Sequence, residues 1–192
     1  MCGIFGYLGK NNNAAKIVVA GLKRLEYRGY DSWGVAVPNS GDVSLFKKVG
    51  AIGTVEGVDL PESMVAIGHT RWATHGGVTE PNAHPHYSQD KSFVLAQNGM
   101  VDNFEELKAD LASKGHNFET ETDTEIIVRL VEEELKETKN LEEAVRATFL
   151  KLKGRNTIII LTKDGKIIAA RNGSPLVIGK SEDGEIYFSS DT

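Results

Sequence analysis

The chain has 192 residues with 22 basic and 27 acidic side chains, which gives a formal net charge of −5 with histidines neutral. This acidic balance argues against a nucleic-acid-binding protein, because such a protein needs a basic face to displace phosphate counterions. The composition, 40% hydrophobic and 26% charged, is typical of one soluble globular domain that buries enough surface to fold without disulfides.

The single cysteine is Cys2. One cysteine cannot form an internal disulfide, which excludes a stapled secreted scaffold. No apolar stretch approaches the ~20 residues of a membrane span. The start Met1-Cys2-Gly3 lacks the charged segment and apolar core of a signal peptide. We therefore expect a cytoplasmic protein.

The first half of the chain predicts several strands and one helix. The helix is predicted over residues 14–25, where Ile17, Val18, Leu22 and Leu25 lie near helical spacing, and Arg28-Gly29 should end it. Strands are predicted by short apolar runs at 4–8, 35–37, 43–46, 65–68 and 93–96. The second and third runs flank a turn-forming segment, so they should form a hairpin.

Residues 70–91 form a long segment with little periodicity, and loops of this length within a compact domain are usually functional. Helices are then predicted over 103–114, 124–138 and 141–153, the second with Thr122 or Asp123 as its cap. Asp-Gly pairs within 163–166 and 182–185 predict two closing hairpins. This order of elements favours an α+β fold in which helices cover sheets.

A lone cysteine is more often a buried core residue than a nucleophile, but Cys2 is second in the chain. If Met1 is removed, the thiol and a free α-amine belong to the same residue. An α-amine titrates near 8 and a thiol near 8.5, so the amine can accept the thiol proton and later deliver it to a leaving group. Cys2 is therefore a candidate nucleophile that carries its own base, with core filling as the alternative.

Five further segments support the nucleophile hypothesis. Cys2-Gly3-Ile4-Phe5-Gly6 resembles the start of class II glutamine amidotransferases, which are N-terminal-nucleophile hydrolases. The other matching segments, in order, are 24–32 (RLEYRGYDS), 69–76 (HTRWATHG), 82–86 (NAHPH), Asn98-Gly99 and 121–125 (ETDTE). The tyrosine-flanked Arg28-Gly29-Tyr30-Asp31 is similar to the glutaminase domain of the glucosamine-6-phosphate synthase group within that family.

The resemblance runs from Cys2 to Asp191 and implies a four-layer αββα sandwich. It implies that residues 1–192 form one type 2 glutaminase domain and that sugar-isomerase domains lie outside this chain. The implied activity is hydrolysis of L-glutamine to glutamate and ammonia through a Cys2 γ-glutamyl thioester. The ammonia would serve the conversion of fructose 6-phosphate to glucosamine 6-phosphate on an isomerase-type domain, with no cofactor, nucleic acid or membrane involved.

Recognition of glutamine requires a cation for its carboxylate and an anion for its ammonium group. Arg71 is the candidate cation, because a guanidinium holds a carboxylate with two parallel hydrogen bonds, and the family adds Thr74 and His75. The alternative for Arg71 is a loop ion pair. Asp123 is the candidate anion, with helix capping as its alternative.

Attack on the amide also creates an oxyanion that needs fixed hydrogen-bond donors. Asn98 and Gly99 match the family's oxyanion hole, although Asn-Gly after a strand is also a common tight turn. Trp72 resembles the family's gating tryptophan, and the alternative is an ordinary buried aromatic. Arg28 and Asp31 are expected to support the N-terminal region, and Gly29 to allow a turn or a close backbone approach.

His75, His84 and His86 fall within twelve residues, so a metal site has to be weighed. The only cysteine is distant in sequence and Pro85 separates the closest pair, so we expect loop-stabilising hydrogen bonds, including one from His86, and no metal.

The chain departs from the family at three places. Gln97 stands where histidine is frequent, Trp33 where a small residue is frequent, and Arg155-Asn156-Thr157 where a run like Ala-Tyr-Ala is frequent. None of these positions has a chemical step assigned to it. Two alternatives stay open, a glutaminase that serves another acceptor and an inactive partner-binding homologue.

Overall fold

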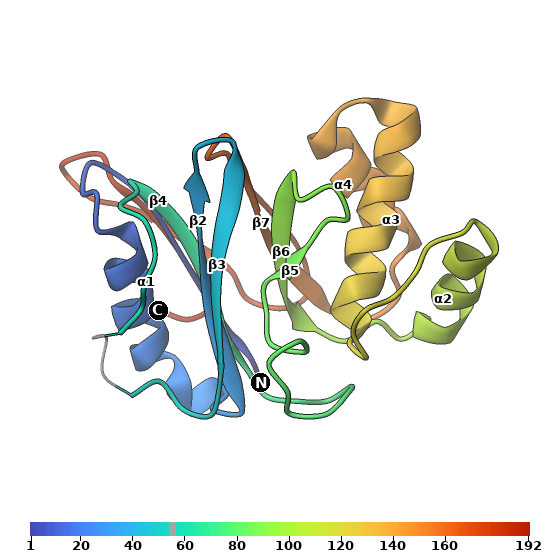
Figure 1. The fold of residues 1–192 in the computed structure, drawn as a ribbon, viewed down its shortest axis with the longest axis horizontal. Coiled ribbons are helices and arrows are strands. Elements are labelled where there is room, and N and C mark those ends of the chain that lie inside the picture. The colour runs from blue at the N-terminus through green and yellow to red at the C-terminus, as the bar shows by residue number, and fades with distance from the viewer. Residues whose placement is uncertain (54–56) are drawn as a thin grey trace.

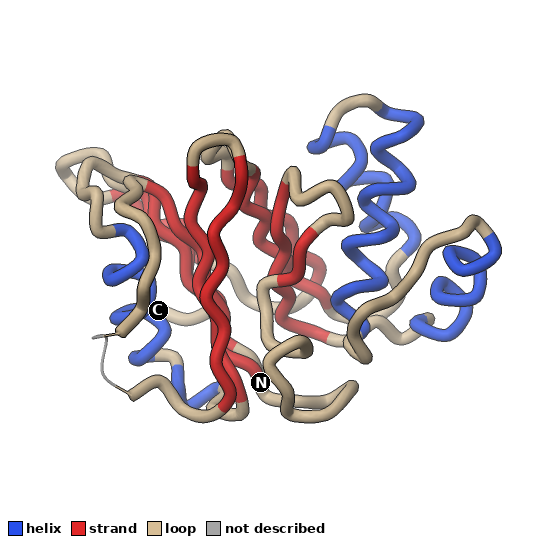
Figure 2. Tube along the Cα trace, viewed as in Figure 1, coloured by secondary structure: helices blue, strands red, loops and turns tan. Residues whose placement is uncertain are grey.

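The computed structural model describes residues 1–53 and 57–192. Two antiparallel sheets are stacked face to face, and helices cover both outer faces (Figure 1 and Figure 2). Helix α1 (Ala14–Arg24), at the left of Figure 1, covers one sheet, and three helices at the right cover the other. The resulting αββα order of layers confirms the expected fold class.

The first sheet has six strands in the order β3-β2-β4-β1-β10-β9. Their bounds are β1 (Gly3–Leu8), β2 (Ser32–Asn39), β3 (Asp42–Val49), β4 (Val65–Arg71), β9 (Val177–Lys180) and β10 (Ile186–Ser189). The first strand of the chain therefore lies inside the sheet, with β4 on one side and β10 on the other. Cys2, which directly precedes β1, is consequently held beside the end of β4.

The second sheet has four strands in the order β5-β6-β7-β8. Its elements and their covering helices are β5 (His86–Tyr87), β6 (Phe93–Gly99), β7 (Asn156–Thr162), β8 (Ile167–Asn172), α2 (Phe104–Ser113), α3 (Asp123–Thr138) and α4 (Leu141–Lys151). In the register of the two central strands, Asn98 faces Thr157 and Gly99 faces Asn156.

Three apolar clusters fill the three interfaces between the four layers. Val18 and Leu22 of α1 pack on Val35 of the first sheet. Residues such as Ile67 and Ile159 meet between the sheets. Between the second sheet and its helices the fully buried residues include Leu95, Ile127, Leu130 and Ile158. Strands β4 and β6 are covered on one face by the other sheet and on the opposite face by helices. Their apolar runs are therefore continuous, as the sequence predicts.

The predicted elements are present, with differences at their ends. Both Asp-Gly hairpins form, joining β7 to β8 and β9 to β10. Helix α1 ends at Arg24, and a separate 3₁₀ turn over Glu26–Arg28 leads to Gly29. The hairpin strands β2 and β3 are longer than the apolar runs that predict them. Polar residues at the ends of both strands also take part in the pairing. Among the described residues, no helix has the length and apolarity needed to cross a membrane.

Candidate active site

Cys2 lies against the backbone of the segment that follows β4. The backbone N–H of Trp72 points at the Cys2 Sγ at 3.3 Å, and the Trp72 carbonyl oxygen is 3.6 Å from the same sulfur. Burial raises the pKa of the Cys2 thiol, while the Trp72 hydrogen bond and the positive N-terminus act to lower that pKa. Burial is the larger influence, so the thiol is held mainly in its protonated form, and the nearby positive charges offset only part of the cost of ionising it.

The backbone of Cys2 is fixed by a residue near the other end of the chain. Arg28 donates from Nε to the Cys2 carbonyl oxygen at 3.1 Å, and its Nη1 forms an ion pair of 2.9 Å with Asp191. Asp191 also accepts a hydrogen bond from Tyr27. Asp191 carries no motif of its own in the sequence. Only its position at the limit of the family resemblance could have drawn attention to it.

Asp31 and Gly29 hold the Trp72 segment in place. Asp31 accepts from the backbone N–H of Ala73 at 2.9 Å and donates its own N–H to the Arg71 carbonyl at 3.0 Å. A Cβ at Gly29 would lie 2.6 Å from the Arg71 carbonyl carbon and 2.7 Å from the Trp72 nitrogen. Gly29 therefore permits two backbone segments to approach closely, one of the two roles expected for it.

The end of β6 presents Asn98 and Gly99 beside Cys2. The side-chain amide of Asn98 is buried, and both its nitrogen and its oxygen lack a partner among the described residues. An unpaired buried amide is costly, so a ligand atom at this position would gain from pairing with it. Gly99 has φ +142°, and a Cβ there would lie 2.1 Å from the Arg155 carbonyl oxygen. Asn98 and Gly99 are the last paired residues of β6, so the alternative of a tight Asn-Gly turn is not realised, and the oxyanion role stays open to them.

Arg71, at the end of β4, is buried and faces the loop that follows it. Its guanidinium donates to the Gly77 carbonyl at 2.9 Å, to the Gly76 carbonyl at 3.3 Å and to the His75 carbonyl. The alternative of a loop ion pair does not hold, because these partners are neutral. The positive charge of Arg71 is therefore available to an anion that replaces or joins the carbonyls.

The loop is tied in turn to the segment before α3. Glu121 accepts from the Gly77 N–H and from the Asn82 side-chain amide, each at 2.9 Å, and Asn82 accepts from the Glu121 N–H at 3.0 Å. Asn82 and Glu121 lie within matched segments but were not assigned a role from the sequence. Their contact joins the loop that covers Arg71 to the segment that leads to Asp123.

Asp123 is the first residue of α3, and Thr122 occupies the N-cap position without a side-chain capping bond. The Asp123 carboxylate instead accepts from the Val101 backbone N–H at 2.9 Å. Burial raises the pKa of Asp123, and this hydrogen bond acts to lower it. The capping alternative for Asp123 is therefore not realised, and its second carboxylate oxygen can serve a cationic ligand.

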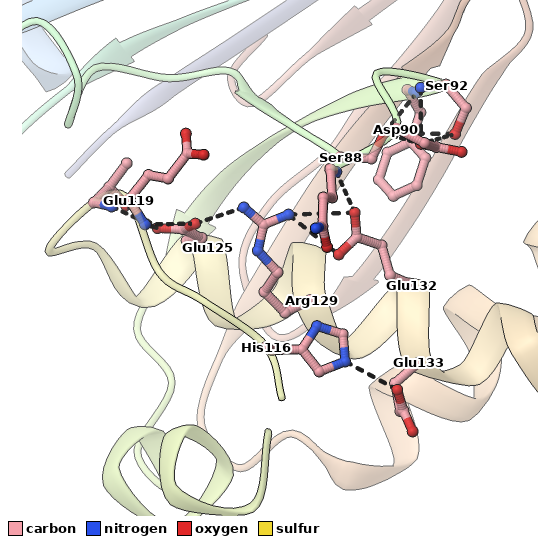
Figure 3. Close-up of polar contacts among 12 residues, drawn as sticks. Ser88, Asp90, Ser92, His116, Glu119, Glu125, Arg129, Glu132 and Glu133 are labelled. Atoms are coloured by element: carbon pink, nitrogen blue, oxygen red, sulfur yellow. Dashed lines mark hydrogen bonds and ion pairs between the residues drawn. The ribbon is translucent and has the colours of Figure 1, made fainter. Parts of the chain in front are cut away.

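Figure 3 shows how the start of α3 is anchored. Glu125 accepts from the backbone N–H groups of Glu119 and Thr120, at 3.0 and 2.7 Å, and pairs with Arg129 at 2.7 Å. Arg129 also contacts Glu132 at 3.2 Å. Since Glu125 and Arg129 are both buried, this network fixes the first turns of α3 and so the direction of Asp123.

His84 and His86 lie behind the site, beside His69. The ring centroids of His69 and His84 are 4.2 Å apart, and those of His84 and His86 are 4.7 Å apart. The rings bond to threonines, His86 to Thr122 and His84 to Thr124, each at 3.0 Å. Burial lowers the pKa of all three rings, that of His69 to about 3. They are therefore neutral, hydrogen-bonded supports.

The remaining candidates lie at the mouth of the site. Trp72 is 44% exposed and packs edge-on against Tyr30 at 5.6 Å, so it is not an ordinary buried aromatic. Thr74 is exposed. His75 contributes its carbonyl to Arg71, while its ring packs on Phe104 at 5.5 Å. Trp33, one of the departures, is buried against Phe46 in the first sheet.

Cys2 lines two cavities. The larger, of about 540 Å³, is open and is lined by Cys2, Arg28, Trp72, Asn98, Gly99 and Arg155 among others. The smaller, of about 10 Å³, is lined by Cys2, Arg71, Thr74, His75, Gln97, Gly99 and Asp123 among others. The small cavity thus brings a thiol, a cation and an anion together, as recognition of an α-amino acid with a reactive side chain requires.

Comparison with known proteins agrees with this arrangement. Residues 69–192 match the family model described as "Glutamine amidotransferase domain". The whole chain is 46% identical to the glutamine–fructose-6-phosphate aminotransferase (isomerizing) of Methanococcus maripaludis and 44% identical to that of Pyrococcus horikoshii. It spans about a third of the length of these relatives, 33% and 32% respectively.

Among solved structures, the glutamine phosphoribosylpyrophosphate amidotransferase of B. subtilis superposes with a TM-score of 0.82 at 29% identity. That match covers 98% of this chain and 42% of the other. A glutamine aminotransferase class-II domain protein from Silicibacter pomeroyi shares the fold, with a TM-score of 0.64 at 15% identity. The matched family model, together with this fold, shows that the chain belongs to the glutamine amidotransferase domain family.

Proposed function

We propose that this chain hydrolyses L-glutamine to glutamate and ammonia with Cys2 as the nucleophile. The observation that carries the proposal is the small cavity in which Cys2, Arg71 and Asp123 meet. In this assignment Arg71 binds the substrate carboxylate and Asp123 binds the α-ammonium group. The side-chain amide then extends toward the Cys2 thiol.

Binding requires the loop after β4 to adjust, because the cavity of about 10 Å³ holds little more than a single water. The substrate carboxylate competes with the carbonyl oxygens of His75, Gly76 and Gly77 for the Arg71 guanidinium. A bidentate pair between guanidinium and carboxylate is stronger than bonds to neutral carbonyls, so the exchange favours the substrate.

The chemistry follows from the groups around the thiol. In the chain described here Met1 precedes Cys2, so the α-amine of Cys2 is free only after Met1 is removed. That amine takes the thiol proton, and the thiolate adds to the amide carbon of glutamine. The Asn98 side-chain amide and the Gly99 N–H stabilise the oxyanion. The carbon–nitrogen bond breaks as the amine returns the proton, releasing ammonia. The amine then takes a proton from a water that attacks the thioester carbon, the carbon–sulfur bond breaks, and the proton passes to the Cys2 sulfur as glutamate leaves.

We assign the ammonia to the conversion of fructose 6-phosphate to glucosamine 6-phosphate on an isomerase-type domain outside residues 1–192. The support is the similarity to relatives named glutamine–fructose-6-phosphate aminotransferase, which are about three times as long as this chain. The B. subtilis glutamine phosphoribosylpyrophosphate amidotransferase has a similar fold, but its name gives a different acceptor. Its sequence identity to this chain, 29%, is lower than that of the aminotransferases. Trp72 lines the open cavity beside Cys2, where it can control the exit of ammonia.

The test uses protein from which Met1 has been removed, with the free α-amine of Cys2 verified by mass spectrometry. We expect it to release glutamate and ammonia from glutamine in equal amounts, and Cys2→Ala to release neither. A glutamine-analogue electrophile should label Cys2 and stop turnover. Full activity in Cys2→Ala would refute the mechanism. A processed, folded chain that neither hydrolyses glutamine nor reacts with the electrophile would instead be an inactive partner-binding homologue.

A further inference from the structure

Two of the three departures from the family pattern contact each other. Gln97 and Asn156 are 59 positions apart, yet the Gln97 Nε2 donates to the Asn156 Oδ1 at 2.6 Å. Both side chains are buried, at 2% and 1% exposed. The two departures are therefore one hydrogen-bonded pair, at the junction of β6 and β7.

The other end of the Gln97 side chain reaches helix α3. Its Oε1 accepts from the Thr124 hydroxyl at 2.5 Å. Since that hydroxyl donates to Gln97, it has to accept from the His84 Nε2, which lies 3.0 Å away. The Gln97 main chain is held as well, because the His69 Nε2 lies 2.8 Å from its carbonyl oxygen. One side chain thus joins the start of α3 to the start of β7.

The hydrogen-bonded residues Thr124, Gln97 and Asn156 contact the proposed site at both of its sides. Asn156 is the register partner of Gly99, and a Cβ at Gly99 would lie 2.9 Å from the Asn156 Oδ1. The Asn156 amide therefore packs directly under the Gly99 backbone. At the other end, Gln97 lines the small cavity together with Cys2 and Asp123.

We propose that Gln97 is a positioning residue that fixes the oxyanion-binding end of β6 relative to the Asp123 end of α3, acting through Asn156 and Thr124. This inference rests on the proposed glutaminase function. It assigns Gln97 no contact with the reacting atoms. Its effect is to hold the Gly99 N–H and the Asn98 amide in the geometry that the tetrahedral oxyanion needs.

The test measures ground-state binding and oxyanion stabilisation separately. Glutamine turnover gives kcat and KM. The aldehyde of L-glutamate γ-semialdehyde adds to the Cys2 thiol, forming a carbon–sulfur bond and an oxygen that occupies the oxyanion position. Gln97→Met keeps the length of the side chain and removes its hydrogen bonds. We expect it to lower kcat about tenfold or more, and to weaken the aldehyde adduct by a similar factor, with a smaller change in KM.

Two further variants keep the inference testable if Gln97→Met does not fold. Thr124→Val removes the hydroxyl that orients Gln97, and Thr124→Ser restores a hydroxyl, so the first should lose kcat and the second should recover most of it. Thr148→Val is the matched control, because the buried Thr148 hydroxyl on α4 has no partner among the described residues. It should leave kcat and the adduct affinity unchanged.

Non-additivity supplies an independent check. Gln97→Met combined with Asn156→Leu should cost no more than the more damaging single change, because both remove the same contact. Folded Gln97→Met and Thr124→Val with kcat and adduct affinity within twofold of the parent would overturn the inference. A parent chain that releases no glutamate would instead be a failure of the proposed function.

Discussion

Replacement of Gly99 by alanine tests whether the end of β6 carries the oxyanion. At φ +142° an alanine is strained by about 1–3 kcal/mol. Its Cβ would also lie 2.1 Å from the Arg155 carbonyl oxygen, so one of two paired strands has to shift by about 1 Å. A shift of that size misplaces the Gly99 N–H, and removing one oxyanion donor costs about 10²–10³ in kcat.

The assay is glutamate release, with thermal unfolding measured on the same sample. Gly179→Ala on the exposed strand β9 is the matched control, because nothing lies within 4 Å of a Cβ built there. We expect Gly99→Ala to lose both stability and at least about 10² in kcat, and Gly179→Ala to lose neither. Activity of folded Gly99→Ala within fivefold of the parent would refute the reasoning.

The remaining predictions concern binding, support and pH. Arg71→Lys cannot form a bidentate pair, so the KM for glutamine should rise about 10- to 100-fold with a smaller effect on kcat, and an unchanged KM in steady-state kinetics would contradict the assignment. Asp191→Asn weakens the ion pair that orients Arg28 on the Cys2 carbonyl, so kcat should fall about two- to fivefold, and an unchanged kcat would count against that support. Acid should destabilise the fold through the buried histidines. Their folded pKa values lie below the unfolded value of about 6.5, so the unfolded chain binds protons first and stability falls as pH drops below about 6.5. With a folded pKa of about 3, His69 alone should cost about 1.4 kcal/mol between pH 7.5 and 5.5, measured by urea unfolding, and equal stability at the two pH values would contradict this.

Local patterns predicted the elements well because their causes are local. The Asp-Gly hairpins form where the turn residues stand, and α3 begins at Asp123 next to its Thr122 cap position. The order of strands in the first sheet did not follow from such patterns. Strand β10 pairs with β1, and the Ser190 hydroxyl accepts from the Ile4 N–H across 186 positions. Contacts of this kind depend on the assembled layers.

The candidate site was also predictable only in part. Motifs marked Cys2, Arg71 and Asp123, and the structure brings all three to one cavity, although their chemical roles stay predictions. The residues that hold them were harder to predict. Asp191 supports Arg28 from a distant strand end, and Gln97 meets Asn156 only because β6 pairs with β7. The sequence contains both residues of each pair but not the register that joins them.

The central claim is that Cys2 acts as a nucleophile with its own α-amine as the base. The most direct measurement compares two forms of the same chain, one that retains Met1 and one from which Met1 has been removed, each verified by intact mass. We predict glutamate release and stoichiometric labelling of Cys2 by a glutamine-analogue electrophile in the processed form, and turnover lost in the form with Met1. Equal turnover of the two forms, or a processed form that is folded and inactive, would contradict the account.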